Sequence, residues 1–528
     1  MTTGASEPLQ ADDGDAMHHL SDLASAIDHQ ELAGDALVTG ITEDSRQVRP
    51  GWLFVARRGA QSDGHRFVAE AIARGAAAVV VEHRQALGVP QLVTPNTSAA
   101  VGPLAAAFYG YPSRHLAVVG VTGTNGKTTT CELVRAAIEA TGRPAGQIGT
   151  IATRVGRQSE PATMTTPAPT ELQRHLHRMV QAGVEAVAME VSSHALDQYR
   201  VDGTEFAVGV FTNLDTEHLD YHGTLEQYWA AKARLFEPGR CRTALVCVDS
   251  SWGRRLAHQA RVPVVTFGQD PGADVRYTVE DSGLRGSTVH LSGRHGDVTI
   301  PTQMIGAVNG PNVAGAYLAA RELGVPSATI VSALAECPRP PGRFELVDEG
   351  QPFLVVVDYA HTPEALASLV DTARHCAGPG GVVRVVVGAR GGRDRFKRPR
   401  TGAVAASAGP VVLTTDSPGT EDPWSIIEQL RLGTVGVRGA NVAVEPDRRR
   451  AIAMAIDAAG PGDVVLIVGR GHEQVQHIAG EAIPLDDRQV AHAALALRRG
   501  GRHGAAVASA ASRLPARLEQ QDRPAPAR

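Results

Sequence analysis

Apolar runs rich in valine alternate along this chain with stretches that have helical spacing. The run Leu116-Ala117-Val118-Val119 is one such buried strand. In the last third of the chain, Leu366, Leu369, Val370 and Ala373 share one helix face through i, i+3, i+4, i+7 spacing. Alternation of buried strands with helices is typical of parallel α/β architecture. The sequence therefore predicts an α/β fold.

The alternation falls into three blocks, each predicted to be a domain. The first block has strands in 52–56 and 77–82 around a helix in 66–74, and it ends near Tyr111-Pro112-Ser113. A proline-rich segment, 338–342, suits a linker between the second and third blocks. The expected domains are 17–112, 113–338 and 339–499.

The two ends of the chain lack this pattern. Residues 1–16 are polar and acidic, and residues 500–528 are biased toward Ala, Arg and Pro without steady periodicity. We expect both segments to be disordered.

The second and third blocks supply most of the predicted strands. The third block resembles a Rossmann-like sheet, but it lacks a GxGxxG opening, so its topology alone predicts no nucleotide. The strand candidates are 186–190, 208–212 and 243–248 in the second block, and 353–358, 382–387, 411–415 and 464–468 in the third.

The segment 120–130, GVTGTNGKTTT, carries the sharpest functional signal. A strand that runs into a glycine-rich turn and then Gly-Lys-Thr offers backbone N–H groups, the Lys127 charge and the Thr128 hydroxyl to a polyphosphate and its Mg²⁺. The usual Walker spacing places a Gly five residues before Gly126, whereas this chain has Val121 there. The loop is a variant phosphate site, and the central domain is predicted to be P-loop ATPase-like.

Polar residues follow the next two predicted strands. Glu190 ends the strand 186–190, where open α/β sheets present ligand groups. It is a candidate Mg²⁺ ligand, and the alternative is an ordinary salt bridge. The segment 211–223, FTNLDTEHLDYHG, is rich in His, and its alternative interpretation is a solvated loop.

Composition excludes several classes of partner. With 528 residues and a net charge of −5, the chain has no global basic field to attract nucleic acid. Its 5 cysteines show neither CxxC pairing nor the density of a disulfide scaffold, which suits a reducing cytosol. No window reaches the roughly 18 apolar residues of a membrane span. We expect a cytoplasmic monomer that acts on small molecules.

Six segments occur in the order found in Mur ligases. On these motifs the chain, from about Thr39 to Leu497, resembles the Mur ligase family. Within the family it resembles the MurE type, which adds the third amino acid of the peptidoglycan stem to a UDP-N-acetylmuramoyl dipeptide. The resemblance implies three α/β domains, for the UDP-sugar substrate, for ATP and for the amino acid. The segments are TGTNGKTTT (122–130), TMTTP (163–167), MEVSSHALDQYRV (189–201), the segment 211–236, DYAHTPEAL (358–366) and GRGHE (469–473).

The resemblance also implies a mechanism. ATP phosphorylates the substrate carboxylate, and the amine attacks the acyl phosphate and releases phosphate. Lys127 would bind the β/γ-phosphates, Thr128 and Glu190 would bind one Mg²⁺, and His218 would bind a second. Lys232 is a surface lysine by composition, but the resemblance implies that CO₂ carbamylates it into a carboxylate-like ligand near the second ion.

Other family positions carry over residue by residue. Taken singly, each hydroxyl among them is also explained as a helix cap or a turn. The implied ATP contacts are Gly123, Thr124, Asn125, Gly126, Lys127, Thr128, Thr129, Asn312, Arg343 and Asp358. The implied UDP-sugar contacts are Ser45, Thr165, Thr166, Ser192, Gln198 and Arg200. The implied amino-acid contacts are Arg393, Asp416, Ser417, Gly419, Gly469 and Glu473.

The amino-acid pocket departs from the family pattern. MurE enzymes that take meso-diaminopimelate carry Asp-Asn-Pro-Arg, whose Arg binds the distal carboxylate, whereas residues 416–419 here read DSPG. That carboxylate loses its bidentate partner unless Arg390 or Arg395 reaches it. Glu473 should still select an ammonium group. The sequence leaves open diaminopimelate, lysine or ornithine, or another amino acid added by a MurE-like paralogue in a specialised pathway.

Two alternatives to the MurE type remain. One is another member of the Mur and folylpolyglutamate synthetase superfamily, and the SSHAL and DYAHTP segments favour the MurE type over it. The other is a nucleotide-binding regulatory protein without ligase activity. It predicts loss of Lys127, Glu190, His218 or Lys232, and all four are present.

Overall fold

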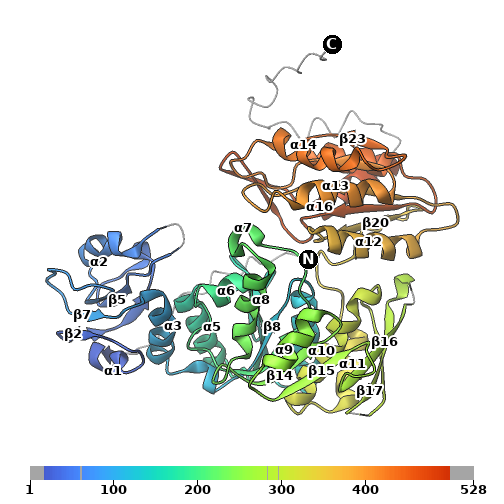
Figure 1. The fold of residues 1–528 in the computed structure, drawn as a ribbon. Helices are drawn as coiled ribbons and strands as arrows, with labels where there is room; N and C mark the ends of the chain where they lie inside the picture. The colour runs from blue at the N-terminus through green and yellow to red at the C-terminus, as the bar shows by residue number, and fades with distance from the viewer. Residues whose placement is uncertain (1–16, 60–61, 282, 295, 500–528) are drawn as a thin grey trace.

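Three main β-sheets, one in each block of the chain, organise the structure (Figure 1). The computed structural model describes residues 17–59, 62–281, 283–294 and 296–499. The segments 1–16 and 500–528, expected to be disordered, lie outside these residues. The predicted three-part α/β fold is confirmed. Because the strands of each main sheet come from a single block, we propose the domain limits 17–112, 113–338 and 339–499.

The N-terminal block is a five-stranded sheet with the order β2-β7-β6-β5-β4. Strands β4 to β7 are parallel, and β2 is antiparallel to β7. Helix α3 lies between this sheet and the central block, where it contacts α5 (Figure 1). The elements are α1 (Leu20–Ala24), β2 (Glu31–Ala33), β4 (Gly40–Thr42), β5 (Trp52–Val55), α2 (Val68–Ala73), β6 (Ala78–Val81), β7 (Gln91–Val93) and α3 (Thr97–Phe108), with the short pair β1 (His18–His19) and β3 (Leu37–Val38).

The central block is an eleven-stranded sheet with the order β11-β10-β9-β12-β8-β13-β14-β15-β16-β17-β18. Strand β8 lies at its middle, parallel to β12 on one side and β13 on the other. The strands are β8 (Ala117–Thr122), β9 (Ala145–Ile148), β10 (Ala152–Val155), β11 (Gln158–Pro161), β12 (Ala186–Glu190), β13 (Phe206–Phe211), β14 (Cys241–Cys247), β15 (Val264–Gly268), β16 (Val275–Asp281), β17 (Ser287–Gly293) and β18 (Val298–Thr302). The helices are α4 (Lys127–Glu139), α5 (Pro169–Gln181), α6 (Ser193–Asp197), α7 (Leu219–His222), α8 (Leu225–Ala233), α9 (Ser251–Gln259), α10 (Gly310–Glu322) and α11 (Ser327–Glu336).

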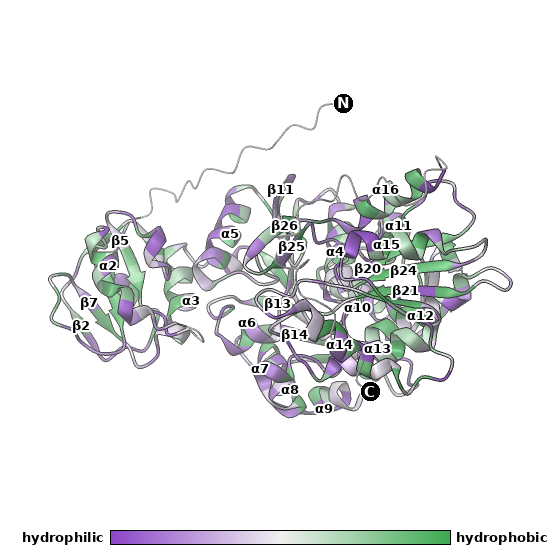
Figure 2. Cartoon of the chain, turned by 90° about the horizontal axis from the view of Figure 1, so that it is seen from above, coloured by the Kyte–Doolittle hydropathy of each residue, from purple (hydrophilic) through white to green (hydrophobic). Residues whose placement is uncertain are grey.

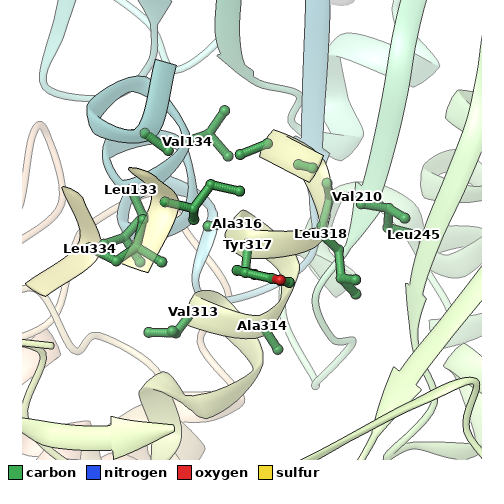
Figure 3. Close-up of a cluster of buried hydrophobic side chains, with 14 of the residues drawn as sticks. Leu133, Val134, Val210, Leu245, Val313, Ala314, Ala316, Tyr317, Leu318 and Leu334 are labelled. Atoms are coloured by element: carbon green, nitrogen blue, oxygen red, sulfur yellow. The ribbon is translucent and has the colours of Figure 1, made fainter. Parts of the chain in front are cut away.

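Strand β16 is parallel to β15, and β17 and β18 extend the central sheet from it by antiparallel pairing; the sequence analysis did not predict these three strands. They alternate buried and exposed positions, as in a sheet with one wet face. The other face belongs to the largest core cluster, which includes Val313 and Leu318 of α10 and Leu133 of α4 (Figure 3). Helix α10 is buried along most of its length, so it fixes α4 and the loop before α4 against the sheet.

The C-terminal block is a six-stranded sheet with the order β19-β20-β24-β21-β22-β23. Strands β20, β24 and β21 are hydrophobic and lie between helices that show hydrophilic faces (Figure 2). The strands are β19 (Glu345–Leu346), β20 (Leu354–Asp358), β21 (Val383–Val387), β22 (Val411–Leu413), β23 (Val442–Val444) and β24 (Val464–Val468), with the hairpin β25 (Val475–Ile478) and β26 (Glu481–Pro484). The helices are α12 (Pro363–Cys376), α13 (Lys397–Ala408), α14 (Pro423–Thr434), α15 (Arg448–Asp457) and α16 (Asp487–Arg499).

A fully buried ion pair joins two helices of this block. Arg448 Nε and Nη2 donate to the Asp487 carboxylate at 2.9 and 2.7 Å, and both side chains are 0% exposed. Arg448 Nη2 also donates to the carbonyl of Val468 at 2.9 Å. Burial opposes the Arg448 charge, but Asp487 outweighs burial and the pKa of Arg448 is raised. The pair therefore anchors α15 and α16 to the end of β24.

We predict that Asp487→Ala lowers the free energy of unfolding by about 3–5 kcal/mol, because it leaves the Arg448 charge buried without its partner. Urea unfolding followed by circular dichroism measures the change. The control is Glu428→Ala, which removes the exposed pair of Glu428 with Arg431 and should cost less than about 1 kcal/mol. Equal losses in the two variants would contradict the prediction.

Candidate active site

One cavity of about 1460 Å³ lies between the central and C-terminal blocks. Its central-block wall includes residues that follow β8, β12 and β13, and its other wall includes residues that follow β20, β21, β22 and β24. Parallel strands that are neighbours in a sheet bring their carboxyl ends to one edge, where α/β folds bind ligands. Two such edges contribute to this cavity.

The glycine-rich loop after β8 is held tightly at two positions. Gly123 and Gly126 have φ of 151° and 89°, which disfavours other residues. A Cβ at Gly123 would clash with the Thr212 hydroxyl, and one at Gly126 would clash with the Asn312 side chain. Helix α4 begins at Lys127, directly after Gly126. The loop thus leads into a helix N-terminus, which is a favourable place for a phosphate, although its glycines do not follow the Walker spacing.

Lys127 lies over the loop that precedes it. Its Nζ donates to the carbonyl oxygens of Gly123 and Thr124, both at 2.9 Å. Burial lowers the pKa of Lys127, and the nearby Glu190 and Glu217 carboxylates partly offset that effect. The ammonium group is therefore next to the loop backbone and available to an anion in the cavity.

A hydroxyl and a carboxylate meet beside this loop. Thr128 Oγ1 donates to Glu190 Oε1 at 2.9 Å, and both residues are buried. Thr150, which the sequence analysis did not identify, donates its backbone N–H to Glu190 Oε1 at 2.9 Å and its hydroxyl to Oε2 at 3.0 Å. These bonds orient Glu190 toward Thr128, and no salt bridge of Glu190 occurs among the described residues.

Lys232 is not a surface lysine, so the interpretation from composition is wrong. It lies on α8, is 1% exposed, and its Nζ donates to the carbonyl of Gly123 at 2.9 Å. Burial and the nearby Lys127 charge hold the pKa of Lys232 well below its usual range. Two lysine Nζ atoms therefore share the carbonyl oxygen of Gly123.

The interpretation of 211–223 as a solvated loop is also wrong at its centre. Glu217 is 4% exposed, and His222 is buried. His218 has φ of 56°, and its Nε2 lies 3.7 Å from Glu217 Oε2. Burial lowers the pKa of His218 to about 3. His218 is therefore neutral at pH 7 and keeps a lone pair for a ligand.

Two contacts link the loop edge of the central block to the C-terminal block. His361 Nε2 lies 2.6 Å from Glu217 Oε1. Arg343 Nη2 donates to Thr128 Oγ1 at 3.3 Å, and its guanidinium lies 4.4 Å from the centroid of the Tyr359 ring. Burial opposes the Glu217 charge, but His361 outweighs it and holds the pKa of Glu217 well below its usual range.

The remaining residues expected at ATP lie close to the loop. Asn312 lies on α10 against Gly126, and its Oδ1 is buried without a hydrogen-bond donor in the described part of the chain. Asp358 ends β20 and accepts from the backbone N–H groups of Phe344 and Ala360, both at 2.7 Å. Burial raises the pKa of Asp358. Asn312 therefore offers a free acceptor, whereas Asp358 is already bonded to backbone.

The residues expected at the UDP-sugar are only partly brought together. Ser192 caps α6 by accepting from Ala195 N at 3.1 Å, so the capping interpretation holds for this residue. Thr166 caps no helix; its hydroxyl donates to the carbonyl of Glu190 at 2.9 Å. Arg200 Nη2 donates to Gln198 Oε1 at 2.7 Å. Ser45 lies in the N-terminal block, where its hydroxyl is 3.4 Å from Glu70 Oε2.

The expected amino-acid pocket is a cluster of charges at the ends of β21, β22 and β24. Arg390 Nη2 donates to Glu473 Oε1. Behind this pair, Arg470 is fully buried and its Nη1 donates to Ser417 Oγ at 2.9 Å. Asp416 is also buried, and the pKa of its carboxyl is lowered because Arg390, Arg448 and Arg470 outweigh its burial. Arg393 is exposed at the cavity wall, and its charge contributes to the lowered pKa of His194.

The cavity wall contains most of the predicted residues. They are Thr124, Asn125, Gly126, Lys127, Thr128, Thr129, Thr165, Thr166, Glu190, Ser192, Arg200, His218, Asn312, Arg343, Asp358, Arg393, Asp416, Ser417 and Glu473. The other predicted residues, which are not part of that wall, are Ser45, Gly123, Gln198, Lys232, Gly419 and Gly469.

Four residues of the site were not predicted, although signals for them exist. Thr150 is among the first polar residues after β9, and Glu217 lies within the His-rich segment. Tyr359 and His361 lie within the DYAHTP motif. Each of these residues lies close after the end of a strand. Its contact partner is far away in the sequence, so the spacing of residues along the chain does not reveal the contact.

Three family models match the chain in consecutive order. The model for the Mur ligase family, catalytic domain, matches residues 37–109. The Mur ligase middle domain matches residues 121–320, and the Mur ligase, glutamate ligase domain matches residues 342–471. Together these matches include both edges of the cavity.

Individual relatives match over nearly their whole length. The chain is 42% identical over 474 residues to a UDP-N-acetylmuramoyl-L-alanyl-D-glutamate--2,6-diaminopimelate ligase of Geobacillus thermodenitrificans, with 88% of this chain and 96% of the relative covered. It is 43% identical to a ligase of the same name from Streptomyces coelicolor, with 91% and 97% covered.

A solved structure of a ligase of that name, 30% identical, has a TM-score of 0.62 and covers 88% of this chain and 95% of its own. Similarity on this scale extends through all three blocks of the structure. The chain therefore belongs to the Mur ligase family.

Proposed function

We propose that this protein is an ATP-dependent ligase that joins diaminopimelate to the D-glutamate of UDP-N-acetylmuramoyl-L-alanyl-D-glutamate, in peptidoglycan precursor synthesis. The observation that carries the proposal is the single cavity shared by the P-loop edge of the central sheet and the charged edge of the C-terminal sheet. The relatives at 42% and 43% identity are named for this reaction.

The reaction needs activation because a free carboxylate resists attack by an amine. The γ-phosphoryl group of ATP passes to a carboxylate oxygen, which gives an acyl phosphate and ADP. The amine nitrogen then bonds to the acyl carbon, loses a proton, and phosphate leaves. Lys127 binds the β/γ-phosphates from the central block, and Arg343 approaches from the C-terminal block, so two cations stabilise the charge on the phosphoryl group.

The donor set beside the loop fits Mg²⁺. Thr128 and Glu190 supply hard oxygen atoms, which this ion prefers, and an ion bound there with the phosphates supplies charge neutralisation. Among the described residues, no group of three or more His, Cys, Asp and Glu side chains is placed to hold a metal. A second ion at His218 therefore requires a further ligand.

A carbamate on Lys232 meets that requirement. CO₂ reacts with a neutral amine, forming an N–C bond and releasing one proton, and the depressed pKa of Lys232 favours the neutral amine. The product carries a negative charge, which the neighbouring Lys127 stabilises, and its N–H can still donate to Gly123. The change would place a negative charge beside the Lys127 ammonium, where a second positive charge is disfavoured.

The nucleotide base and the sugar substrate have candidate contacts as well. Asn312 Oδ1 can accept a hydrogen bond from the adenine amino group, and we retain Asp358 on the cavity wall as the candidate contact to the ribose or a phosphate. For the UDP-sugar we retain Thr165, Thr166, Ser192 and Arg200 on the cavity wall, with Gln198 orienting Arg200 and Ser45 in the N-terminal block.

The same observations give less support to the two alternative functions. A paralogue for another amino acid rests on the DSPG sequence at 416–419, but the similarity to diaminopimelate ligases extends along the chain. A regulatory protein without activity does not explain why the cavity keeps Lys127, Glu190 and His218. In the described part of the chain, no helix has the length and apolarity to cross a membrane.

The proposed function is tested by ADP release from purified protein with ATP, Mg²⁺, UDP-N-acetylmuramoyl-L-Ala-D-Glu and a panel of amino acids. We expect saturable turnover with meso-diaminopimelate, and none without the dipeptide substrate or without an amine. Turnover with a different amino acid and none with meso-diaminopimelate would contradict the proposal.

The carbamate is tested with Lys232→Ala. We expect a loss of turnover of at least about 100-fold with no change in the melting temperature beyond a few degrees, because a metal ligand and not a core contact is lost. Short carboxylates such as acetate or formate should partly restore turnover in the variant and leave the wild type unchanged. A variant with full activity, or one that no acid restores, would overturn the assignment.

A further inference from the structure

One ion pair of the charged cluster faces the cavity. Arg390 and Glu473 both belong to the cavity wall, and their side chains are 28% and 24% exposed. Arg390 follows β21 and Glu473 follows β24, which are neighbours in the sheet. The two charges are therefore held at one point of the sheet edge and are accessible to a ligand.

The charged side chains behind this pair are already bonded to other groups of the protein. Arg470 is 0% exposed, and its Nη2 donates to the carbonyl oxygens of Val475 and Leu485 at 3.0 and 3.1 Å. Its Nη1 lies 3.6 Å from Asp416 Oδ1, which is likewise buried. Since this layer contains opposite charges and is closed to solvent, Arg390 and Glu473 form the oppositely charged pair in front of it that a ligand can reach.

Arg390 retains unused binding capacity. Its Nε is buried and has no acceptor among the described residues. The guanidinium lies 5.7 Å from the centroid of the Tyr359 ring, which favours a cation there. Burial opposes its charge, but Tyr359, Asp416 and Glu473 outweigh burial and raise the pKa of Arg390. Arg390 is thus a permanent cation with a donor free for a second oxygen.

We propose that the Arg390–Glu473 pair binds the distal zwitterion of diaminopimelate, and that Arg390 determines the specificity for this amino acid. The inference rests on the proposed function. The distal carbon of diaminopimelate carries one carboxylate and one ammonium group. On binding, the carboxylate replaces Glu473 as the partner of Arg390, and the ammonium replaces Arg390 as the partner of Glu473. Both half-buried charges stay paired, which avoids the cost of an unpaired ion.

This arrangement explains how the site works without an arginine at position 419. Gly419 has φ of 61°, which disfavours a side chain, although the space around it is open. Arg390 supplies a planar donor group to the same cluster from a different strand end. The carboxylate partner is therefore moved along the sheet edge and not lost.

The Arg390–Glu473 pair also explains how the site would discriminate against lysine as a substrate. Lysine carries its distal amine at the same position as diaminopimelate and lacks the distal carboxylate. Its ammonium would compete with Arg390 for the Glu473 carboxylate, and lysine brings no carboxylate of its own to Arg390. A site that leaves a buried charge unpaired discriminates strongly against the smaller ligand.

The experiment compares wild type with Arg390→Gln and the matched control Arg395→Gln. Arg395 lies in the same loop, is 65% exposed, and pairs with Glu421 at 3.5 Å outside the cavity wall. Initial rates give KM and kcat for meso-diaminopimelate, for L-lysine and for the UDP-dipeptide. Circular dichroism melts of all proteins check that they are folded.

We expect Arg390→Gln to raise KM for diaminopimelate by about 10- to 100-fold. KM for the UDP-dipeptide should stay within about twofold, and kcat/KM for lysine should rise, because Glu473 is released. Arg390→Lys should fall between wild type and Arg390→Gln, since it keeps the charge and loses the planar fork. Arg395→Gln should behave as wild type.

The outcomes separate this inference from the proposed function. A diaminopimelate KM unchanged in Arg390→Gln, or an equal loss with lysine and diaminopimelate, would overturn the inference while the ligase function stands. A large rise in KM for Arg395→Gln alone would assign the carboxylate to Arg395 and also overturn it. If Arg390→Gln does not fold, the lysine and diaminopimelate constants of Arg390→Lys decide by the same criterion. No turnover of diaminopimelate by the wild type would reject the proposed function itself.

Discussion

Two buried lysine side chains share one carbonyl oxygen, and the organisation of the site depends on that contact. Lys127 and Lys232 each donate from Nζ to Gly123 at 2.9 Å. Burial and the Lys127 charge together hold the pKa of Lys232 well below its usual range, so the second amine is disfavoured as a cation at this place. The glycine conformations, the Thr212 and Asn312 contacts and the burial of α10 all serve to hold that carbonyl in place.

The contacts between the blocks extend this constraint beyond the loop. His361 reaches Glu217, and Arg343 reaches Thr128, so residues around β19 and β20 of the C-terminal sheet touch the phosphate edge of the central sheet. A carboxylate activated at one edge is thereby presented to an amine bound at the other.

Local pattern was enough to predict most of the fold. The strands 186–190 and 464–468 agree with β12 and β24 to the residue, because continuous apolar runs bounded by polar groups are unambiguous. The pattern failed for Lys232, whose helix has no strong apolar face, and for the antiparallel strands β16 to β18. It also could not reveal that Arg390 meets Glu473, because 83 residues separate them and only the parallel pairing of β21 with β24 brings them together.

The central and C-terminal sheets contribute groups with different expected roles to the cavity, and this separation has a consequence for specificity. The groups expected to activate the carboxylate follow β8, β12 and β13, whereas the groups that would choose the amine follow β21, β22 and β24. On these expected roles, substitutions in the second set would change which amine is accepted without changing the groups at the phosphates. A change of amino-acid specificity would then require substitutions in only a few loops of the C-terminal block, such as an arginine at the end of β21 in place of one at position 419.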